Sequence, residues 1–223
     1  MDPRLRRAVD ASIGWYDDLC ALHGVGSTLT GGVWASTTAP PPLHSDAVVV
    51  EPHVSAADVL DRLADRPHCG VKDSFATLDL STGGLQVLFE ACWMHCDPPP
   101  AGTPSTAWSA VTTADELATW TGLHDTTGVL LPGLLTTAHF TVLAKYDQDR
   151  IVAGAVARLA SGAVDVSNTF AVPGQHLDWA ELAAVVASRF PDRPLVGYTR
   201  GAELDAATAA GFAVVGDLRV WVR

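Results

Sequence analysis

One stretch of the chain has the residue pattern of an anion-binding turn. An extended apolar run over 164–172 breaks at Pro173 and Gly174 and passes into helical periodicity that begins at Asp178. A strand that feeds a helix in this way presents unpaired backbone N–H groups and the positive end of the helix dipole. Phosphate groups bind readily at such junctions, so the pattern favours a phosphate-bearing cofactor.

Asp178 limits how that junction can be used. It stands directly before the helical run 179–186. An aspartate there is a good N-cap, because its side-chain oxygen accepts the N–H groups that a phosphate would otherwise take. Its charge would also repel a pyrophosphate. We therefore expect Asp178 to cap the helix and to weaken phosphate binding.

Together with the segments 195–198 and 210–216, this stretch resembles the GNAT superfamily of acyl-CoA N-acyltransferases. The loop of that family reads Gln/Arg-x-x-Gly-x-Gly/Ala. Here Gln175 and Ala180 stand at matching positions, and Asp178 replaces the central glycine. The resemblance implies an α/β fold with a mixed sheet. It also implies a GNAT-like acyltransferase that uses acetyl-CoA or another acyl-CoA and acts on a small amine or a carrier-bound acyl substrate.

The resemblance also implies where protons would be transferred, because the attacking amine needs a base and the departing thiolate needs an acid. The position that often holds the family's glutamate falls on or near Asn168, which cannot act as a base. Asp165 lies on the opposite face by strand alternation and would serve only if the strand is bulged. The family's usual tyrosine corresponds to Ala207, and Tyr198 is the nearest substitute. The candidate catalytic residues are therefore Tyr198, Asn168 and Asp165.

In this family the pantetheine arm of the coenzyme enters a gap between the fourth and fifth strands, which corresponds here to backbone at 170–172 and 197–200. Backbone groups bind without a particular side chain, so cofactor capture could survive the loss of the glycine. His176 or Arg200 would supply positive charge, although Arg200 also has the simpler interpretation of a solvated turn residue. The candidate cofactor-binding residues are Phe170, Ala171, Val172, Gln175, His176, Leu177, Ala180 and Arg200.

Two other classes of function remain open. The missing glycine, base and acid favour a catalytically silent GNAT-like module that binds a small ligand or a protein partner. A third possibility is a GNAT-fold enzyme of other chemistry, such as decarboxylation, cyclisation or hydrolysis between the two halves of the chain. Asp73, Tyr198 and His139 would be natural participants in such a reaction.

The cysteines do not form a convincing metal site. Cys92 and Cys96 alternate with His95 along a probable strand, whereas metal ligands usually come in tight pairs from a turn. The chain has four cysteines, which are too few and too scattered for a secreted disulfide framework. We therefore expect no metal and reduced thiols.

The composition indicates where the protein is located and which classes of partner are excluded. The chain has 223 residues, of which 48% are hydrophobic and 17% charged, so it can bury a proper core. The net charge is −11, and neither half carries the basic footprint that nucleic acid or an anionic membrane requires. The start of the chain lacks the apolar segment of a signal peptide, so we expect a cytoplasmic protein. Its few lysines and many alanines suggest a GC-rich bacterial genome.

Hydrophobic periodicity predicts the elements that would position these residues. The predicted helices cover 4–23, 55–63, 113–120, 178–190 and 202–210. The predicted strands cover 27–29, 33–36, 47–50, 84–95, 108–111, 138–146, 151–160, 163–172, 195–198 and 212–222. From residue 106 onward the order is β-α-β-β-β-α-β-α-β, which is the order of the GNAT fold.

A proline-rich segment, 98–105, predicts a linker between two parts. We expect a degenerate GNAT-like half over 1–100 and a GNAT-like domain over 101–223. The first part repeats the second weakly, since strand 48–52 and the helix after it parallel 170–173 and helix 178–190. Two such segments can resemble each other by chance. If the repeat is real, the chain is a tandem GNAT with a decayed first copy.

Overall fold

A computed structural model describes residues 1–98 and 105–223 of the chain, and the core of the predicted linker lies outside these residues. Within them the helices are α1 (Pro3–Leu22), α2 (Ala56–Arg62), α3 (Ala114–Leu123), α4 (Trp179–Arg189) and α5 (Ala202–Ala209). The first seven strands are β1 (Ser27–Thr30), β2 (Val33–Ser36), β3 (Ala47–Val49), β4 (Gly70–Asp73), β5 (Gln86–Cys96), β6 (Trp108–Ala110) and β7 (Phe140–Asp147). The others are β8 (Arg150–Ala160), β9 (Ala163–Ala171), β10 (Leu195–Thr199) and β11 (Ala213–Val222), and two short 3-10 turns cover Ser81–Gly83 and Pro132–Thr136.

The predicted helices and strands are all present, most of them with ends displaced by one or two residues. The mixed α/β fold class is therefore confirmed. The capped start of α2 is an example, because Ser55 and Asp58 form a reciprocal capping box there. One strand was missed, namely β4, which is four residues long and contains a lysine and an aspartate. A short strand with two charged residues has no apolar run to reveal it.

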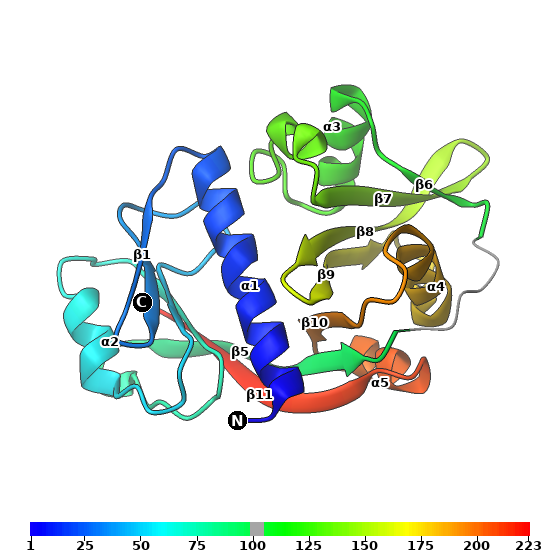
Figure 1. The fold of residues 1–223 in the computed structure, drawn as a ribbon. Coiled ribbons are helices and arrows are strands. Elements are labelled where there is room, and N and C mark those ends of the chain that lie inside the picture. Colours follow the sequence, from blue (N-terminus) through cyan, green and yellow to red (C-terminus); the bar gives the residue numbers. More distant parts are fainter. Residues whose placement is uncertain (99–104) are drawn as a thin grey trace.

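All eleven strands of the described residues form one sheet, in the order β1-β2-β3-β4-β11-β5-β10-β9-β8-β7-β6 (Figure 1). The order has an internal symmetry. On each side three strands form an antiparallel meander, then a helix leads to a parallel strand: β1-β2-β3, α2 and β4 on one side, and β7-β8-β9, α4 and β10 on the other. At the centre, β11 pairs with β4 and β5 pairs with β10, so each side borrows the last strand of the other.

The helices cover both faces of this sheet. In β11, Val220 packs in the apolar cluster of α1 and α3, while its neighbour Trp221 packs in the cluster of α2. In β10, Val196 joins the cluster of α1 and Leu195 joins that of α4. Because successive strand residues point to opposite faces, α1 and α3 lie on one face and α2 and α4 on the other. Figure 1 shows α1 crossing the middle of its face.

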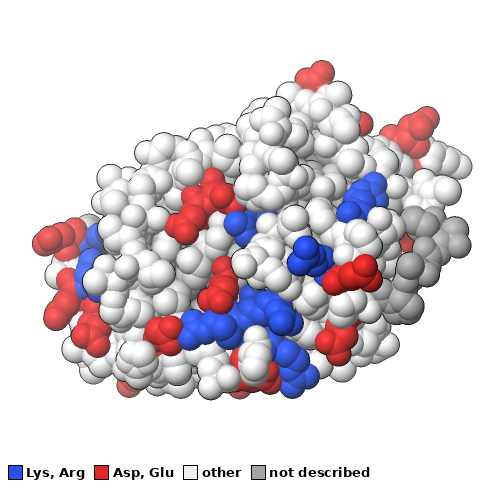
Figure 2. Space-filling model, in the orientation of Figure 1, with Lys and Arg blue, Asp and Glu red and all other residues white. Residues whose placement is uncertain are grey.

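The long helix α1 has clear local causes. Asp2 is its N-cap, since the Asp2 side chain accepts the N–H of Arg4 at 2.8 Å, and Pro3 occupies the first helical position. Its apolar stripe is buried against β5, β9 and β10. Among the described helices, none combines the length and the apolar composition that crossing a lipid bilayer requires. Figure 2 shows basic side chains gathered over the N-terminal part of α1 and mixed with acidic ones.

Candidate functional site

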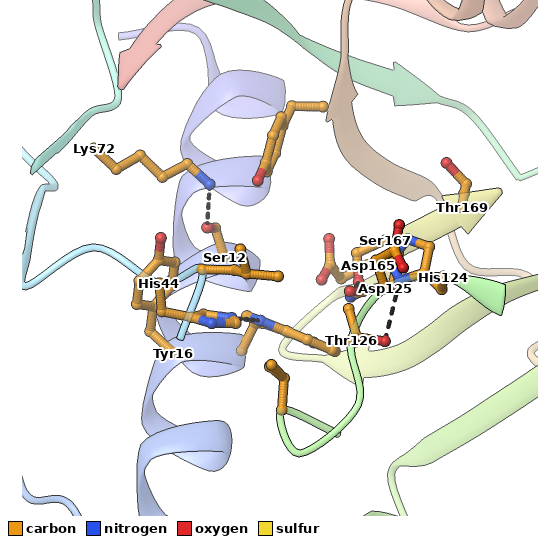
Figure 3. Close-up of a pocket in the computed structure, with 15 residues that line it drawn as sticks. Ser12, Tyr16, His44, Lys72, His124, Asp125, Thr126, Asp165, Ser167 and Thr169 are labelled. Carbon is orange, nitrogen blue, oxygen red and sulfur yellow. Dashed lines mark hydrogen bonds between the residues drawn. The ribbon is translucent and has the colours of Figure 1, made fainter. Parts of the chain in front are cut away.

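A cavity of about 410 Å³ lies on the α1 face of the sheet, and we call it the central cavity. Strands from both sides of the sheet reach it, together with α1, the loop at Leu43 and His44, and the loop that follows α3. Figure 3 shows Lys72 and Ser12 on one side of this cavity, with Asp165, Ser167 and Asp125 across from them. Both sides of the pseudo-symmetric sheet therefore contribute to one site.

The strands β9 and β10 separate beside the central cavity. They pair only at Leu195 with Val164 and at Val196 with Asp165. The next residue of β10 is Gly197, and a Cβ atom at Gly197 would stand 2.5 Å from the carbonyl oxygen of Val166. A side chain therefore does not fit there. Beyond this close approach the two strands have no further ladder pairs, so their facing backbone groups are not bonded to each other in a ladder.

A bulge in β9 brings an additional side chain into the cavity. The pairing with β8 skips from Ser167 to Phe170, and Asn168 has a φ of 50°. Asparagine tolerates this left-handed conformation better than most residues. Asp165 and Ser167 line the central cavity by regular alternation, and the bulge adds Asn168, which alternation alone would put on the opposite face. The strand is bulged, as the sequence-based prediction required for Asp165 and Asn168 to share a face, but Asp165 itself reaches the cavity without the bulge.

The carboxyl group of Asp165 is unusually hard to ionise. Burial raises its pKa to about 6, and the charges of Lys72 and Arg158 offset part of the rise. Arg158 stands opposite Asp165 on β8, but its guanidinium is held by Asp18 at 2.6 Å and lies against Gly14 of α1. Asp165 thus has a pKa close to neutral, as a general base requires.

Lys72, which sequence reasoning missed, faces the cavity from β4. It is only 1% exposed, and its Nζ donates a hydrogen bond to the Oγ of Ser12 at 2.9 Å. The ammonium also lies 3.9 Å from the ring centre of Tyr198 and 4.6 Å from that of Trp93. Burial lowers its pKa to about 7, against the opposing effect of Asp165. Only the recognition of β4 would have pointed to this residue.

Tyr198 connects the cavity with solvent. It is 40% exposed, and its ring packs edge-on against Trp93. Burial of the phenol raises its pKa above the usual tyrosine range, with smaller contributions from Tyr16 and Asp165. The Tyr198 hydroxyl therefore stays protonated near neutral pH and can donate a hydrogen bond, while its raised pKa makes it a weaker proton donor than an ordinary tyrosine.

Two histidines at the rim are neutral at ordinary pH. The Nε2 of His44 accepts a hydrogen bond from the indole of Trp15 at 3.0 Å, and its Nδ1 lies 3.0 Å from the carbonyl of Pro42. Burial lowers the pKa of His44 to about 4. His124 packs against Phe170 and Trp120, and burial lowers its pKa as well. The charge within the cavity therefore comes from lysine and aspartate side chains.

At the predicted anion-binding turn, an aspartate side chain already accepts a helix N–H that an anion would otherwise bind. Asp178 is the N-cap of α4, and its carboxylate accepts the N–H of Glu181 at 2.9 Å, as expected. Gln175, His176 and Ala180 are exposed at this turn. A pyrophosphate at the start of α4 would therefore meet a carboxylate in place of free N–H groups.

The remaining predicted cofactor residues are dispersed. Leu177 is buried in the apolar cluster of α4, and Phe170 packs edge-on against Trp120 of α3. Ala171 is the last residue of β9, and the N–H of Val172, the next residue, still bonds to the carbonyl of Val152. The guanidinium of Arg200 lies over the ring of Phe89 in β5, on the side of β10 away from β9. The guanidinium of Arg200 therefore lies toward β5 and not toward the gap between β9 and β10.

Asp73, Tyr198 and His139, the candidates for decarboxylation, cyclisation or hydrolysis, do not lie together in one site. Asp73 accepts the N–H groups of Phe75 and Leu78, so it stabilises the turn after β4. His139 lies 2.8 Å from the carboxylate of Asp18. Of the three, only Tyr198 lines the central cavity. Within residues 1–98 and 105–223, no three His, Cys, Asp or Glu side chains are placed to hold a metal ion.

Comparisons with known proteins give a consistent result. No protein-family model matches the chain, and no curated protein is significantly similar to it in sequence. Solved structures do resemble it. A GCN5-related N-acetyltransferase from Kribbella flavida superposes with a TM-score of 0.61 at 12% identity, over 96% of this chain and 95% of its own.

Two further structures cover nearly the whole chain. A GCN5-related N-acetyltransferase-like protein from Streptococcus suis has a TM-score of 0.55 at 11% identity, with all of both chains covered. A functionally unknown conserved protein from Staphylococcus epidermidis has a TM-score of 0.65 at 10% identity, over 88% of this chain and 92% of its own. Together with the strand order, these likenesses show that the chain has the fold of the GCN5-related N-acetyltransferases, the GNAT fold.

Proposed function

We propose that this protein is an acyltransferase that moves an acyl group from a thioester donor to the amino group of a small acceptor in the central cavity. The observation that carries the proposal is the position of Asp165, which faces the central cavity at the last ladder pair before β9 and β10 separate. Tyr198 lines the same cavity, and the bulge after Ser167 adds Asn168 to it. A buried carboxyl with a pKa near 6 suits a general base. The phenol of Tyr198 is the proton donor beside the same gap, and its raised pKa makes it a weaker acid than an ordinary tyrosine.

The proposed roles account for each proton. The Asp165 carboxylate takes a proton from the acceptor amine as its nitrogen bonds to the acyl carbon. The bond from that carbon to sulfur breaks, and the Tyr198 hydroxyl gives its proton to the thiolate. Asn168 and Thr169 lie in the bulge, outside the regular ladder with β8. A backbone N–H released in this way can donate to the acyl oxygen, where negative charge develops.

The donor that we propose is acetyl-CoA or another acyl-CoA. The gap between β9 and β10 supports binding of its arm through backbone groups at 166–170 and 197–199. The turn before α4 supports its phosphates poorly, because Asp178 already satisfies the helix N–H of Glu181. We therefore expect the arm and the acyl group to supply most of the affinity, and the phosphates little.

We also propose that the chain is a tandem GNAT, with halves 1–100 and 101–223. The support is the repeated order of meander, helix and parallel strand on each side of the sheet, and the reciprocal placement of β5 and β11. In the first half, β3 and β4 stay paired from Ala47 and Val71 to Val49 and Asp73. Within residues 1–98 that half has no gap equivalent to the one beside Gly197, so we assign the donor to the second half.

Product formation tests the proposal directly. The purified protein is incubated with acetyl-CoA and a panel of small amines, and acylated products are identified by mass spectrometry. We expect Asp165→Asn and Tyr198→Phe to lower the rate strongly. Glu90→Gln, which alters an exposed ion pair with Arg219, is the matched control and should retain the wild-type rate. Equal rates for Asp165→Asn and wild type would reject Asp165 as the base.

A second candidate is a catalytically silent module, which the occupied cap at Asp178 favours. Such a protein would bind its ligand without turnover. In that case no amine in the panel would be acylated, and the substitutions at Asp165 and Tyr198 would change ligand affinity alone.

A further inference from the structure

The central cavity carries opposite charges on opposite sides. Lys72 enters from β4 beside α1, and Asp165 enters from β9 (Figure 3). Within the described part of the chain, neither of them forms an ion pair within 4.0 Å. Two buried, opposite charges separated by open volume are costly for folding alone, so their arrangement calls for a ligand.

The Lys72 ammonium is incompletely satisfied by the protein. An ammonium has three N–H donors, and Ser12 is the single hydrogen-bond acceptor that the described residues provide for it. Its other near neighbours are the rings of Tyr198, Trp93 and Tyr16. These rings attract a cation but accept no conventional hydrogen bond. An anionic oxygen in the cavity would supply what is missing.

A ligand with a single charge would satisfy only one side. A simple amine would place a second cation in a cavity that already holds Lys72, and a simple carboxylate would bring a second anion toward Asp165. A molecule with both groups matches both sides at once. Trp15 and Tyr16 of α1 line the cavity as well and offer apolar surface for the carbon skeleton between them. The volume of about 410 Å³ suits a small molecule.

We propose that the acceptor is a small amino carboxylate, with its carboxylate bound by Lys72 and Ser12 and its amino group directed to Asp165. The amine then lies beside the gap between β9 and β10, where acyl transfer is proposed. This inference names the substrate class of the proposed function and rests on that function only for the reaction. The binding of the ligand is a separate property.

The test is a binding measurement that needs no acyl donor. The full chain is screened by thermal shift against the proteinogenic amino acids, β-alanine and γ-aminobutyrate. The best binders are then titrated calorimetrically beside the corresponding amine without a carboxylate and the corresponding acid without an amine. We expect the amino carboxylate to bind at least tenfold more tightly than either analogue, as loss of one charge-assisted hydrogen bond implies.

Two variants test which side chain binds each end of the amino carboxylate. Lys72→Met should abolish the preference over the amine, and Asp165→Asn should abolish the preference over the acid. Ser12→Ala is a milder second variant on the Lys72 side and should reduce the first preference. Lys145→Met is the matched control, because the other lysine of the chain pairs with Glu181 away from the cavity. It should leave both preferences unchanged.

The outcomes separate this inference from the proposed function. Binding of an amino carboxylate that depends on Lys72, without acylation, supports the inference and contradicts acyl transfer. Acylation of amines with no benefit from a carboxylate supports acyl transfer and overturns the inference. If no amino carboxylate binds better than its amine, or if Lys72→Met retains the preference, the inference is wrong.

Discussion

Asp165 and Asn168 face the same cavity although they stand three positions apart in one strand. The left-handed backbone at Asn168 accompanies an extra residue in β9 after Ser167, which brings Asn168 to the face that Asp165 already occupies. Asp165 lies before the bulge, in the regular ladder opposite Arg158 and in the last pair with β10, which it forms with Val196. The proposed base is therefore placed by regular strand geometry, and the bulge adds Asn168 and its backbone to the same site.

The close approach of the strands makes Gly197 sensitive to a single methyl group. In Gly197→Ala the new Cβ would meet the Val166 carbonyl at 2.5 Å, so the strands must move apart. We expect a loss of about 1–3 kcal/mol in the free energy of unfolding, as overpacking usually costs. We also expect weaker binding of acetyl-CoA, because the gap changes shape.

Urea denaturation and calorimetric titration would measure these two effects. Gly122→Ala is a matched control, since Gly122 lies in α3 and a Cβ there meets nothing within 4 Å. It should leave the affinity unchanged and raise stability slightly. A Gly197→Ala protein as stable as wild type would show that the strands tolerate separation.

Replacing Lys72 with methionine should stabilise the protein in a way that depends on pH. The folded-state pKa of about 7 lies below the ordinary lysine value of 10.5, so burial of the charged form is opposed at and below neutral pH. The cost is largest below pH 7 and declines as pH rises toward 10.5. We therefore expect Lys72→Met to raise the free energy of unfolding more at pH 6 than at pH 9. The difference should be on the order of 2 kcal/mol, since one pKa unit corresponds to about 1.36 kcal/mol.

Thermal and urea denaturation at the two pH values would measure that difference. Lys145→Met serves again as the control, because the Lys145 side chain is partly exposed. If Lys72→Met raises the free energy of unfolding equally at pH 6 and pH 9, burial does not lower the pKa of Lys72 in the folded protein.

The carboxylate of Asp178 should oppose binding of the donor phosphates. Asp178→Asn keeps a capping side chain and removes the charge, and Asp178→Gly also opens the turn at a cost of a few tenths of a kcal/mol. We expect both variants to bind acetyl-CoA more tightly, by about 0.3–1 kcal/mol for a charge at a helix N-terminus. Their affinity for acetyl-pantetheine, which lacks the nucleotide, should stay the same. An unchanged affinity for acetyl-CoA would place its phosphates elsewhere.

Much of the fold could be predicted from the sequence because its elements carry strong local signals. The helix at 179–189 follows a capping aspartate, and the meander of β7, β8 and β9 consists of long apolar strands joined by short turns. The exchange of β5 and β11 could not be predicted, since pairing between strands so distant in sequence leaves no local pattern. The short strand β4 was hidden by its two charged residues.

The candidate site was predictable in part. Asp165, Asn168 and Tyr198 were found through the resemblance to the GNAT family, and they line one cavity. The bulge that brings Asn168 into it has only the asparagine itself as a sequence signal. Lys72 lies on the unrecognised strand, far from the others in sequence, so its part in the same site became visible only in three dimensions.

The pH dependence of acyl transfer tests the role of Asp165 most directly. The measurement is kcat/KM for acetyl transfer to one reactive amine between about pH 5 and pH 8, for wild type and Asp165→Asn. Because Asp165 must be ionised to act as a base and has a pKa of about 6, the wild-type value should fall as pH drops through that range. Asp165→Asn should lose roughly 10²-fold or more in rate and should lack this limb. A variant that keeps both the rate and the acidic limb would contradict the account.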